Sequence, residues 1–574
     1  MENSATWRVA ILRSSTLEPA LPLLEAEGLL NGITLQARCG GFNNYTEEIL
    51  GAKSWLYDFE PKLIVLAIET RDILPELWDR FADISQDTIK RRIDETIAIF
   101  QKVIAALSLR TSASLLIHTF AAPSCLAMGV LDSQAIKGQN DAVYLANQAL
   151  RNLAREHPGV YILDYDALVA QFGRSNWWDE EKWLISRVPF SAGAVTKLAH
   201  EWLRFILPLA GKIRKVLVMD LDNTLWGGTV GEDGMPGIEL GSEYPGAYFL
   251  AVQRTALDLA SRGILLALCS KNNESDAMAV LRDHPAMLLR PCHLAAWRIN
   301  WKDKVLSLRE LAAELKLGLD TFAFLDDSPS ERALVSAYLP EVQVIDLPDD
   351  PSGYAAALRD VAGFERLSLS AEDSSRNHYY AGERARAIAY RASSSLENFW
   401  RNLEIEITIA PISAATLPRI VQLIQKTNQF NLTTTRYSER DLARIMRAPE
   451  WNTYAVSSRD RFGDSGLIAL ALINHQADCC VIDNLLLSCR VIGRGIETAL
   501  LSRIADDARA GGAKILRGKF IATTKNGPSA AFYVDHRFCH KGESDGFAIY
   551  ELDLMTQTVL WPDWITEHTS GSTR

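Results

Sequence analysis

Two aspartates, Asp220 and Asp222, stand one residue apart directly after the apolar run VLVM, within the stretch VLVMDLDNTLWGG at residues 216–228. Such an apolar run predicts a buried strand, and open α/β sheets bind their ligands beyond the carboxyl ends of their strands. Two carboxylates this close repel each other unless water or a cation lies between them. The pair is therefore either a solvated turn or part of a site for something positively charged.

Further polar residues follow later apolar runs of the same region. The residues that we select from the stretches ILLALCSKNN, NWKDK and FAFLDD are Ser270, Lys271, Asn272, Lys302, Lys304, Asp326 and Asp327. Acids gathered at one edge of a sheet can hold Mg²⁺, and one of the carboxylates can attack phosphorus. Lysine and serine donors can neutralise the phosphoryl oxygens as charge spreads over them. The sequence thus predicts phosphate chemistry.

The stretches DLDNTLWGG, CSKNN, NWKDK and FLDDSPSER, in this order, resemble the four motifs of the haloacid-dehalogenase (HAD) superfamily of phosphatases. The resemblance implies that Asp220 is the nucleophile, Asp222 the general acid and base, and Ser270 a phosphate ligand. It also implies that Lys304, or alternatively Lys302, holds the nucleophile and the phosphate. The implied magnesium ligands are Asp220, Asp222, Asp326 and Asp327. The implied substrate contacts beside the motifs are Thr224, Lys271, Asn272 and Lys302.

The spacing between these motifs leaves no room for a cap domain. Between Asp222 and Ser270 lie a glycine-rich flap, GGTVGEDGMPG, and one helix-length segment, AYFLAVQRTALDLASRG. Between Ser270 and Lys304 there is room for little more than a helix and a strand. Because HAD phosphatases of small molecules usually insert a cap at one of these places, the resemblance implies an open site that meets a macromolecule or a carrier-bound group.

The C-terminal third contains a glycine-rich turn before a long helical segment. In SCRVIGRGIETALLSRIADDA, Arg490, Gly493 and Gly495 form the pattern R-x-x-G-x-G. Backbone N–H groups at a helix N-terminus can cradle an anion such as pyrophosphate. With Asn526 and Tyr533 in NGPSAAFY, the pattern resembles the acyl-CoA loop of the GNAT acyltransferase fold, and the alternative is an ordinary glycine-capped helix start. Since no general base for amine acetylation is evident, pantetheine docking fits the pattern as well as catalysis does.

The segment QKTNQFNLTTTRYS, residues 425–438, is dense in amides and hydroxyls. Together with the motifs above it resembles, along the whole chain, the FkbH-like HAD class IIIC proteins of polyketide pathways. Members of that family load a glyceryl unit from 1,3-bisphosphoglycerate onto the thiol of an acyl carrier protein and remove the phosphate. The resemblance implies Mg²⁺ as cofactor, and it implies two partners: 1,3-bisphosphoglycerate or a related phosphate, and the phosphopantetheine arm of a carrier protein.

The acyl step would benefit from a protein thiol. Cys269 directly precedes Ser270, and Cys292 is the other candidate in this region. Cys269 is therefore a candidate catalytic residue that carries the acyl group. The alternative is a plain core cysteine, because buried free cysteine is common.

The opening stretch VAILRSSTLEP resembles the start of an SGNH-hydrolase-like domain, with Ser14 or Ser15 at the nucleophile turn. Such hydrolases also need a late D-x-x-H motif, whereas NWWDEEKWLISRVPFSAGA offers Asp179 and no histidine near it. Without a base to take its proton, serine is a poor nucleophile. We therefore expect a docking or scaffold domain, and we interpret His118 as a hydrogen-bonded histidine at the edge of the core.

Alternating apolar runs and helix-length segments must position all of these residues. A length of 574 residues suggests three or four domains. We expect an α/β multidomain chain: an SGNH-like α/β domain over residues 1–209, a capless Rossmann-like HAD domain over 210–365, a helical connector over 366–395 and a GNAT-like α+β domain over 396–574. The predicted strands are VAIL, LIVLAI, SLLIH and VYIL in the first domain, KVLVMDL, ILLALCS, FAFLDD and VQVIDL in the second, and EIEITIA, TYAVSSRD, GLIALALI, CCVIDNLLL and FAIYELDL in the third.

Composition argues against several classes of protein. The formal net charge is −11 and no long basic run occurs, so nucleic acid is not expected as a partner. No apolar run reaches the ~18 residues that a membrane span needs, and the N-terminus lacks the pattern of a signal peptide. Eight cysteines without a C-x-x-C pair suit the reducing cytoplasm.

Two other functions remain open at this stage. One is a phosphatase for another phosphorylated molecule, with structural flanking domains. The other is a carrier-protein docking scaffold with a vestigial HAD site, against which the intact set of acids, serine and lysine argues. The sequence leaves open the exact substrate, the pathway product, the cognate carrier and the oligomeric state.

Overall fold

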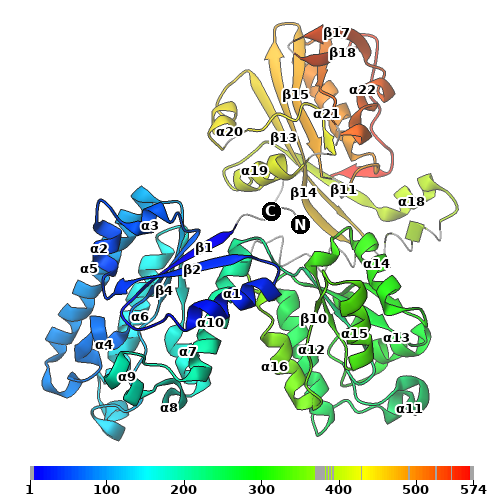
Figure 1. The fold of residues 1–574 in the computed structure, drawn as a ribbon. Coiled ribbons are helices and arrows are strands. Elements are labelled where there is room, and N and C mark those ends of the chain that lie inside the picture. Colours follow the sequence, from blue (N-terminus) through cyan, green and yellow to red (C-terminus); the bar gives the residue numbers. More distant parts are fainter. Residues whose placement is uncertain are drawn as a thin grey trace. The chain divides into compact units, whose positions relative to one another are not determined.

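The computed structural model describes residues 6–368, 382, 386, 389–390, 393–427, 429–437, 439–488, 491–523, 526–544 and 546–568. The chain divides into two compact units, residues 1–291 with 297–374 and residues 292–296 with 375–574. The first unit contains two β-sheets, and the second contains a third, larger sheet (Figure 1). Most of the connector expected over residues 366–395 lies outside the described residues.

The N-terminal sheet is parallel throughout and has the strand order β2-β1-β3-β4-β5. Its strands are β1 (Trp7–Arg13), β2 (Leu35–Phe42), β3 (Leu63–Ala67), β4 (Ser114–His118) and β5 (Val160–Leu163). Four of them are the strands that the apolar runs predict, and β2 is an additional edge strand. Residues of both faces are buried, which is why the inner strands read as continuous apolar runs.

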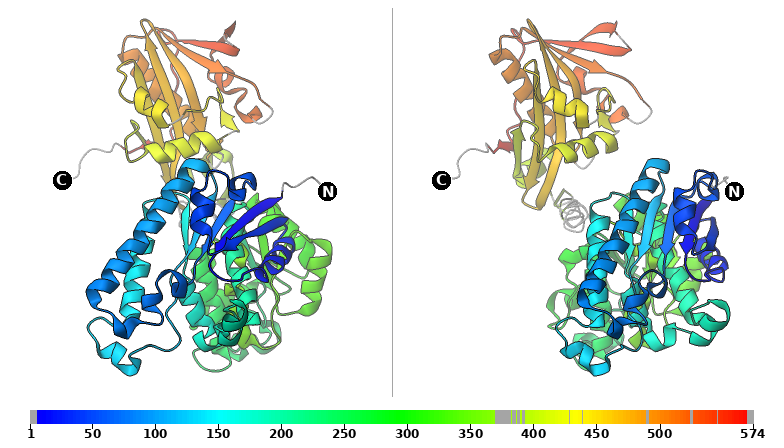
Figure 2. Two further views of the ribbon diagram at one scale, coloured as in Figure 1. Left: turned by 60° about the vertical axis from the view of Figure 1, so that its left-hand side comes forward. Right: turned by 90° about the vertical axis from the view of Figure 1, so that its left-hand side faces the viewer.

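Helices cover both faces of this sheet (Figure 2). The main ones are α1 (Ala20–Leu30), α5 (Gln86–Arg110), α6 (Gln139–Arg155), α7 (Tyr165–Phe172) and α10 (Ala192–Leu209). Residues of α1, α7 and α10 share one apolar core with the sheet, and residues of α5 and α6 share the other. The domain is thus a three-layer α/β structure, as the alternation of strand and helix signals predicts.

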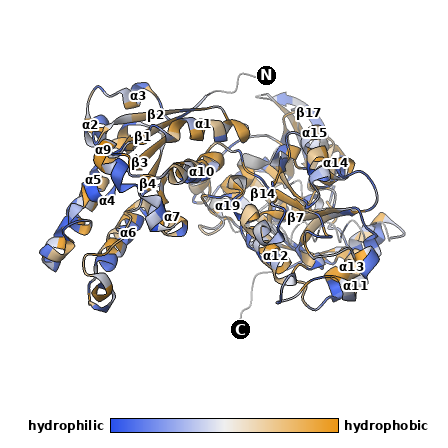
Figure 3. Cartoon of the chain, turned by 60° about the horizontal axis from the view of Figure 1, so that its bottom comes forward, coloured by the Kyte–Doolittle hydropathy of each residue, from blue (hydrophilic) through white to orange (hydrophobic). Residues whose placement is uncertain are grey.

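The second sheet carries the acidic motifs and has the order β10-β9-β6-β7-β8. Its strands are β6 (Val216–Met219), β7 (Leu265–Ser270), β8 (Leu294–Ile299), β9 (Phe322–Leu325) and β10 (Gln343–Val344). The central strand β6 pairs in parallel with both β7 and β9. Figure 3 shows the apolar character of central strands such as β7 against the mixed character of the outer helices.

Only short insertions interrupt this second domain. Between β6 and β7 the chain forms α11 (Val230–Gly237) and α12 (Gly246–Ser261), and between β7 and β8 it forms α13 (Glu274–Asp283) and a single 3-10 turn. The remaining helices are α14 (Lys304–Leu315), α15 (Pro329–Tyr338) and α16 (Tyr354–Arg359). No separate cap is inserted between residues 216 and 304, all of which are described, in agreement with the motif spacing.

The third sheet is mixed, with the strand order β17-β18-β16-β15-β14-β13-β11-β19, and β12 pairs β15 beside this path. Its strands are β11 (Ile405–Ala410), β12 (Phe430–Asn431), β13 (Trp451–Asp460), β14 (Gly463–Gln476), β15 (Cys479–Leu487), β16 (Ile515–Phe520), β17 (Cys539–Ser544), β18 (Phe547–Asp553) and β19 (Ile565–Glu567). Helix α21 (Ile496–Ala510) packs on one face, and α19 (Leu417–Lys426) packs on the other. This is the α+β arrangement that the sequence predicts.

The parallel strands β15 and β16 separate after four paired residues, the last pair being Ile482 and Gly518. Beyond that point the short strand β12 and the residue after it lie between them. The N–H of Leu432 donates to the Leu485 carbonyl at 3.1 Å, and the N–H of Ile521 donates to the Leu432 carbonyl at 2.9 Å. Part of the amide-rich segment therefore closes the gap between the two strands.

Across the described ranges, no helix combines the length and the apolar character that a membrane crossing requires.

Candidate active site

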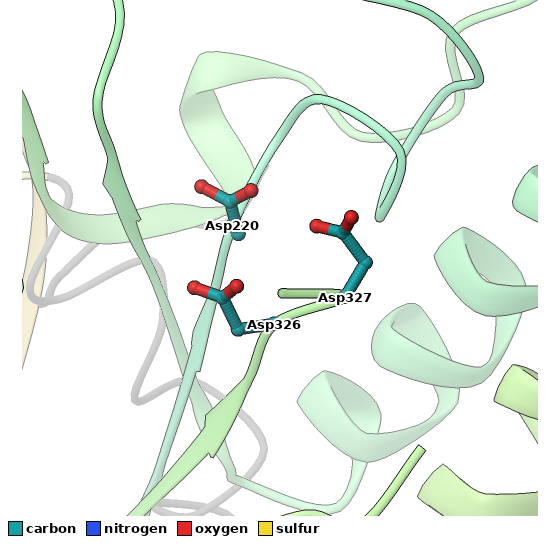
Figure 4. A group of neighbouring side chains, drawn as sticks. All are labelled: Asp220, Asp326 and Asp327. Atoms are coloured by element: carbon teal, nitrogen blue, oxygen red, sulfur yellow. The ribbon is translucent and has the colours of Figure 1, made fainter. Parts of the chain in front are cut away.

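The two acidic motifs meet at the carboxyl edge of the second sheet. Asp220 directly follows β6 and Asp326 directly follows β9, and these strands are hydrogen-bonded neighbours in register, Met219 opposite Leu325. One carboxylate oxygen each of Asp220, Asp326 and Asp327 lies within 4.8 Å of the others. Figure 4 shows the three carboxylates around one common space.

Lys304 lies between two of these acids. It is the first residue of α14, whose N-cap Asp303 accepts a hydrogen bond from the N–H of Val305. The Lys304 Nζ is 2.9 Å from Asp220 Oδ1 and 2.5 Å from Asp326 Oδ2, and all three side chains are buried. Burial lowers the pKa of Lys304, but the attraction of the two carboxylates outweighs this effect and holds the pKa above its usual value. The ammonium group is therefore a permanent charge in the site.

The same acids carry more negative charge than one lysine neutralises. Burial, and then the neighbouring Asp220, raise the pKa of Asp326 to about 7 despite Lys304. The same two causes raise the pKa of Asp327. A group of carboxylates with raised pKa values is a site whose repulsion a bound cation would relieve, and three carboxylate oxygens fit the preference of Mg²⁺ for hard oxygen ligands. The donor set thus fits a magnesium ion.

Asp222, which the resemblance implies as a fourth magnesium ligand, lies outside this group of three carboxylates. Its Oδ1 accepts hydrogen bonds from the indole N–H of Trp226 at 2.8 Å and from the N–H of Val230 at 3.1 Å. Its Oδ2 accepts from the amide of Asn272 at 2.8 Å. These bonds tie the strand end to the flap and to the loop after β7, so the carboxyl group is oriented without help from a metal. Burial raises its pKa.

Other residues hold the loops of the site in place, and two of them were not selected from the sequence. The hydroxyl of Thr224 donates to Asp327 Oδ1 at 3.2 Å and accepts from the Asp327 N–H at 3.1 Å. The guanidinium of Arg332 donates to the carbonyls of Asp326 and Asp327 at 2.9 and 2.7 Å. Arg332 is the last residue of the stretch FLDDSPSER, and Trp226 lies within DLDNTLWGG, so each belongs to a motif that the sequence already marked.

Not every predicted residue of this region lies among the acids. Lys302 is exposed and pairs with Glu310 at 3.2 Å, so Lys304 is the lysine that reaches Asp220. Lys271 forms an ion pair with Glu331 at 2.6 Å. Ser270 is buried at the end of β7.

Cys269 precedes Ser270 on β7 and is buried, with an exposed fraction of 1%. Its Sγ lies 3.9 Å from the backbone carbonyl of Lys304. Burial is the main cause that raises the pKa of this thiol to about 12. The thiol is therefore un-ionised at neutral pH, and a buried un-ionised thiol is a poor nucleophile.

The glycine-rich turn of the C-terminal domain leads into a helix whose first turn contains an acid, Glu497. Gly493 and Gly495 have positive φ angles of 78° and 86°, and Gly495 caps α21. The half-buried Glu497 lies in the first turn of α21, and desolvation raises the pKa of its carboxyl group. The helix N-terminus expected to cradle pyrophosphate is thus next to a carboxyl group. Arg490 lies outside the described residues.

Asn526 and Tyr533 are parts of the domain interior. The amide of Asn526 donates to the carbonyls of Asn431 and Ile521 at 3.1 and 2.8 Å, which links β12 to the end of β16. The ring of Tyr533 is buried and stacks on Tyr550. A Cβ at Gly518 would lie 2.2 Å from the Tyr533 ring, so glycine is required there. Both residues were expected to contact the substrate, but the side chains of both are buried.

In the N-terminal domain, the residues considered for hydrolase chemistry do not form a triad. Ser14 and Ser15 are completely buried after β1. His118 accepts a hydrogen bond at Nε2 from the indole of Trp202 at 2.8 Å, and burial lowers its pKa to about 3, as befits a neutral core histidine. Asp179 caps α9 (Glu180–Ser186) by accepting from the N–H of Lys182 at 3.0 Å.

Comparison with known proteins gives two informative similarities. Residues 8–206 match the family "FkbH, N-terminal domain". The chain is also similar to the crystal structure of the N-terminal part of the protein BF1531 from Bacteroides fragilis, described as containing a phosphatase domain complexed with Mg. Sequence identity is 26%, the TM-score is 0.58, and the match covers 63% of this chain and 95% of that one.

Weaker structural similarities involve acetyltransferases. The ribosomal-protein-S18-alanine N-acetyltransferase of Escherichia coli is 17% identical, covers 26% of this chain with 94% of its own length and gives a TM-score of 0.21. The GNAT domain of S. lividans PAT is 19% identical, covers 25% of this chain with 89% of its own length and also gives a TM-score of 0.21. None of the curated proteins matches the chain significantly.

Proposed function

We propose that this chain, an FkbH-like protein of the HAD type, is a Mg²⁺-dependent enzyme that removes phosphate from a glyceryl unit and delivers that unit to an acyl carrier protein. The HAD-type phosphatase is the part that the matches to the FkbH N-terminal domain and to the BF1531 fragment support directly. The single observation that carries it is the buried contact of Lys304 with Asp220 and Asp326 beside Asp327.

In the proposed hydrolysis of phosphate, each residue of this site has a separate chemical role. Asp220 attacks phosphorus, the bond from phosphorus to the substrate oxygen breaks, and an aspartyl-phosphate forms. Asp222, oriented by its three hydrogen bonds, gives a proton to the leaving oxygen and then takes one from the water that hydrolyses the aspartyl-phosphate. Lys304, whose Nζ lies 2.9 Å from Asp220 Oδ1, holds that carboxyl group in place and offsets the charge of the phosphoryl oxygens.

The proposed magnesium ion would be held by Asp220, Asp326 and Asp327. When bound, it would neutralise charge on the phosphoryl group and orient it for in-line attack. The magnesium in the crystal structure of the similar BF1531 fragment supports this assignment.

The proposed acyl step begins from 1,3-bisphosphoglycerate. The thiolate of the carrier's phosphopantetheine arm attacks the acyl carbon, and the bond to the C1 phosphate breaks to give phosphate and a 3-phosphoglyceryl thioester. The site at Asp220 then hydrolyses the remaining phosphate ester. Because a mixed anhydride is already activated, the thiolate needs orientation and an oxyanion partner rather than a further cofactor. The absence of an inserted cap between residues 216 and 304 supports access for a carrier-bound substrate.

Intact-mass spectrometry tests the whole proposal. A carrier protein with its phosphopantetheine arm is incubated with the enzyme, Mg²⁺ and 1,3-bisphosphoglycerate. We expect the carrier to gain the mass of a glyceryl group without phosphate. If the carrier keeps its mass while phosphate is released from simple esters, the proposed acyl transfer is refuted and only the phosphatase activity stands.

Removal of the metal should abolish phosphate release. We expect activity to disappear in excess chelator and to return with Mg²⁺, since without the cation Lys304 alone would have to offset the charges of the acids and of the phosphoryl group. Asp327→Asn should raise the Mg²⁺ concentration for half-maximal activity by about tenfold or more, the effect of losing one charged ligand. We choose Asp327 because Asp326 also pairs with Lys304, and the exposed Asp349 serves as a matched control as Asp349→Asn. Full activity in chelator would refute the metal assignment.

Replacement of Cys269 should distinguish transfer of the acyl group through the Cys269 thiol from direct transfer to the thiol of the carrier protein. Since the thiol is buried and un-ionised, we expect Cys269→Ala to leave the glyceryl mass shift of the carrier and the release of phosphate in the same ratio as in the wild type. The exposed Cys292, as Cys292→Ala, is the matched control. Loss of the mass shift alone, with hydrolysis of simple phosphate esters retained, would show instead that Cys269 carries the acyl group.

A further inference from the structure

The N-terminal sheet has a topological switch point that the proposed function does not use. In the order β2-β1-β3-β4-β5 the direction of strand addition reverses between β1 and β3. Open parallel sheets bind ligands in the crevice beyond the carboxyl ends of their strands at such a point. Here Ser14 follows β1, Glu69 follows β3, and the N–H of Glu69 donates to Ser14 Oγ at 2.9 Å. The switch point is thus lined by polar residues from both strands.

Unpaired polar atoms gather around this point. Among the described residues, the buried side-chain atoms without a hydrogen-bond partner include Ser15 Oγ, Arg71 Nε, Asp72 Oδ2 and Trp178 Nε1. The exposed fractions are 0% for Ser15, 9% for Arg71 and 8% for Trp178. Buried polar groups in native proteins are almost always satisfied by protein, water or a ligand. Four unpaired atoms from one edge of one domain therefore indicate a missing partner.

Contacts within the domain connect these residues. The guanidinium of Arg71 lies over the rings of Trp78, Trp178 and Trp183, with its carbon 4.6, 5.2 and 4.4 Å from the ring centroids. The loop after β1 is bonded to the end of α9, because the N–H of Thr16 donates to the Arg187 carbonyl at 3.0 Å. The loop after β1, the turn after β3 and the tryptophan-rich segment therefore enclose one region.

The chemistry of the unpaired atoms indicates the kind of ligand. Three of them are donors, the Ser15 hydroxyl, Arg71 Nε–H and Trp178 Nε1–H, and one is the acceptor Asp72 Oδ2. The other side of the Arg71 guanidinium pairs with Glu180 at 3.2 Å. Burial raises the pKa of Glu69 to about 8 and also raises the pKa of Asp72, so both of these acids oppose an anion less than exposed carboxylates would. A small, planar, negatively charged group with acceptor oxygens suits this donor set.

We propose that the N-terminal domain contains a second ligand site, at the switch point between β1 and β3, which binds a small organic carboxylate through Ser15 Oγ, Arg71 Nε and Trp178 Nε1. The tryptophan rings around Arg71 exclude water and strengthen the charge-assisted hydrogen bonds. This site involves none of the residues at the Asp220 site, and it does not depend on the function proposed there.

Binding to the full-length protein tests the proposal. Thermal unfolding is followed while sodium acetate, sodium glycerate or sodium malonate is titrated at constant ionic strength, with sodium chloride and acetamide as controls. We expect at least one carboxylate to raise the unfolding temperature of the protein in a saturable way, because a ligand that binds only the folded state stabilises it. Acetamide should have no such effect, since it lacks the charge.

Two conservative variants assign the site. Ser15→Ala and Trp178→Phe each remove one unpaired donor, and each should weaken carboxylate binding by about tenfold, the scale of one charge-assisted hydrogen bond. Trp183→Phe is the matched control, because Trp183 also contacts Arg71 but its indole nitrogen is not among the unpaired atoms. It should bind as the wild type does. Phosphate release at the Asp220 site should be unchanged in all three variants.

Several results would overturn the proposal. They are a carboxylate series without any saturable effect, acetamide binding as tightly as acetate, or full affinity in both Ser15→Ala and Trp178→Phe. If these variants do not fold, a crystal structure of the wild type grown with the carboxylate decides the question. Carboxylate density at the three donors supports the site, and density for water alone refutes it.

Discussion

Asp220→Asn should lower the rate of phosphate release by about a thousandfold or more, while the protein remains folded. An amide oxygen of nearly the same size cannot form the aspartyl-phosphate, so the variant loses the covalent step. The fold should survive because the change also removes one of three mutually repelling carboxylates, and Lys304 keeps its contact with Asp326 at 2.5 Å. Phosphate release from a simple ester, measured with the unfolding temperature, checks both parts.

The control for this variant is Asp283→Asn, an exposed aspartate in the last turn of α13 in the same domain. It should release phosphate at the wild-type rate. A rate near wild type for Asp220→Asn as well would mean that another group attacks phosphorus. Trapping of a phosphorylated protein, detected as a mass increase in the wild type and absent in Asp220→Asn, would confirm the assigned nucleophile.

Lys304→Met should remove activity and destabilise the protein in the same experiment. Methionine fills much of the lysine volume but leaves the carboxylates of Asp220 and Asp326 buried without their ammonium partner. Breaking a buried charge pair by removing one partner costs about 3–5 kcal/mol. We expect this loss in denaturant unfolding with chelator present, and a smaller loss with saturating Mg²⁺, because the cation then neutralises the acids.

Lys302→Met is the matched control, two residues earlier in the same loop. Lys302 is exposed and pairs only with the partly exposed Glu310 in the contacts of the described chain. Exposed ion pairs contribute about 0–1 kcal/mol, so stability and phosphate release should both stay close to wild type. Equal losses in the two variants would mean that the loop, and not the buried ammonium group, is responsible.

Local sequence signals were sufficient for the acidic motifs and for most of the strands. Apolar runs such as KVLVMDL and FAFLDD are long enough to identify buried parallel strands, and the polar residues that end them then lie at one sheet edge. The edge strand β2 was missed because LQARCGGF contains no apolar run and much of it is exposed. Only its pairing with β1 makes it a strand.

The order of the four motifs was by itself sufficient to predict a phosphate site with acids, a serine and a lysine, because each motif is a short stretch next to its own strand or helix. The tertiary structure alone decided which lysine enters the site, since the start of α14 directs Lys304, and not Lys302, toward Asp220. Only the tertiary structure shows that the Asp222 carboxylate accepts hydrogen bonds from Trp226 and Asn272, and that the buried Tyr533 stacks on Tyr550. These outcomes depend on contacts between residues far apart in the chain, and no local pattern encodes which of several equivalent polar or aromatic side chains such packing will bury.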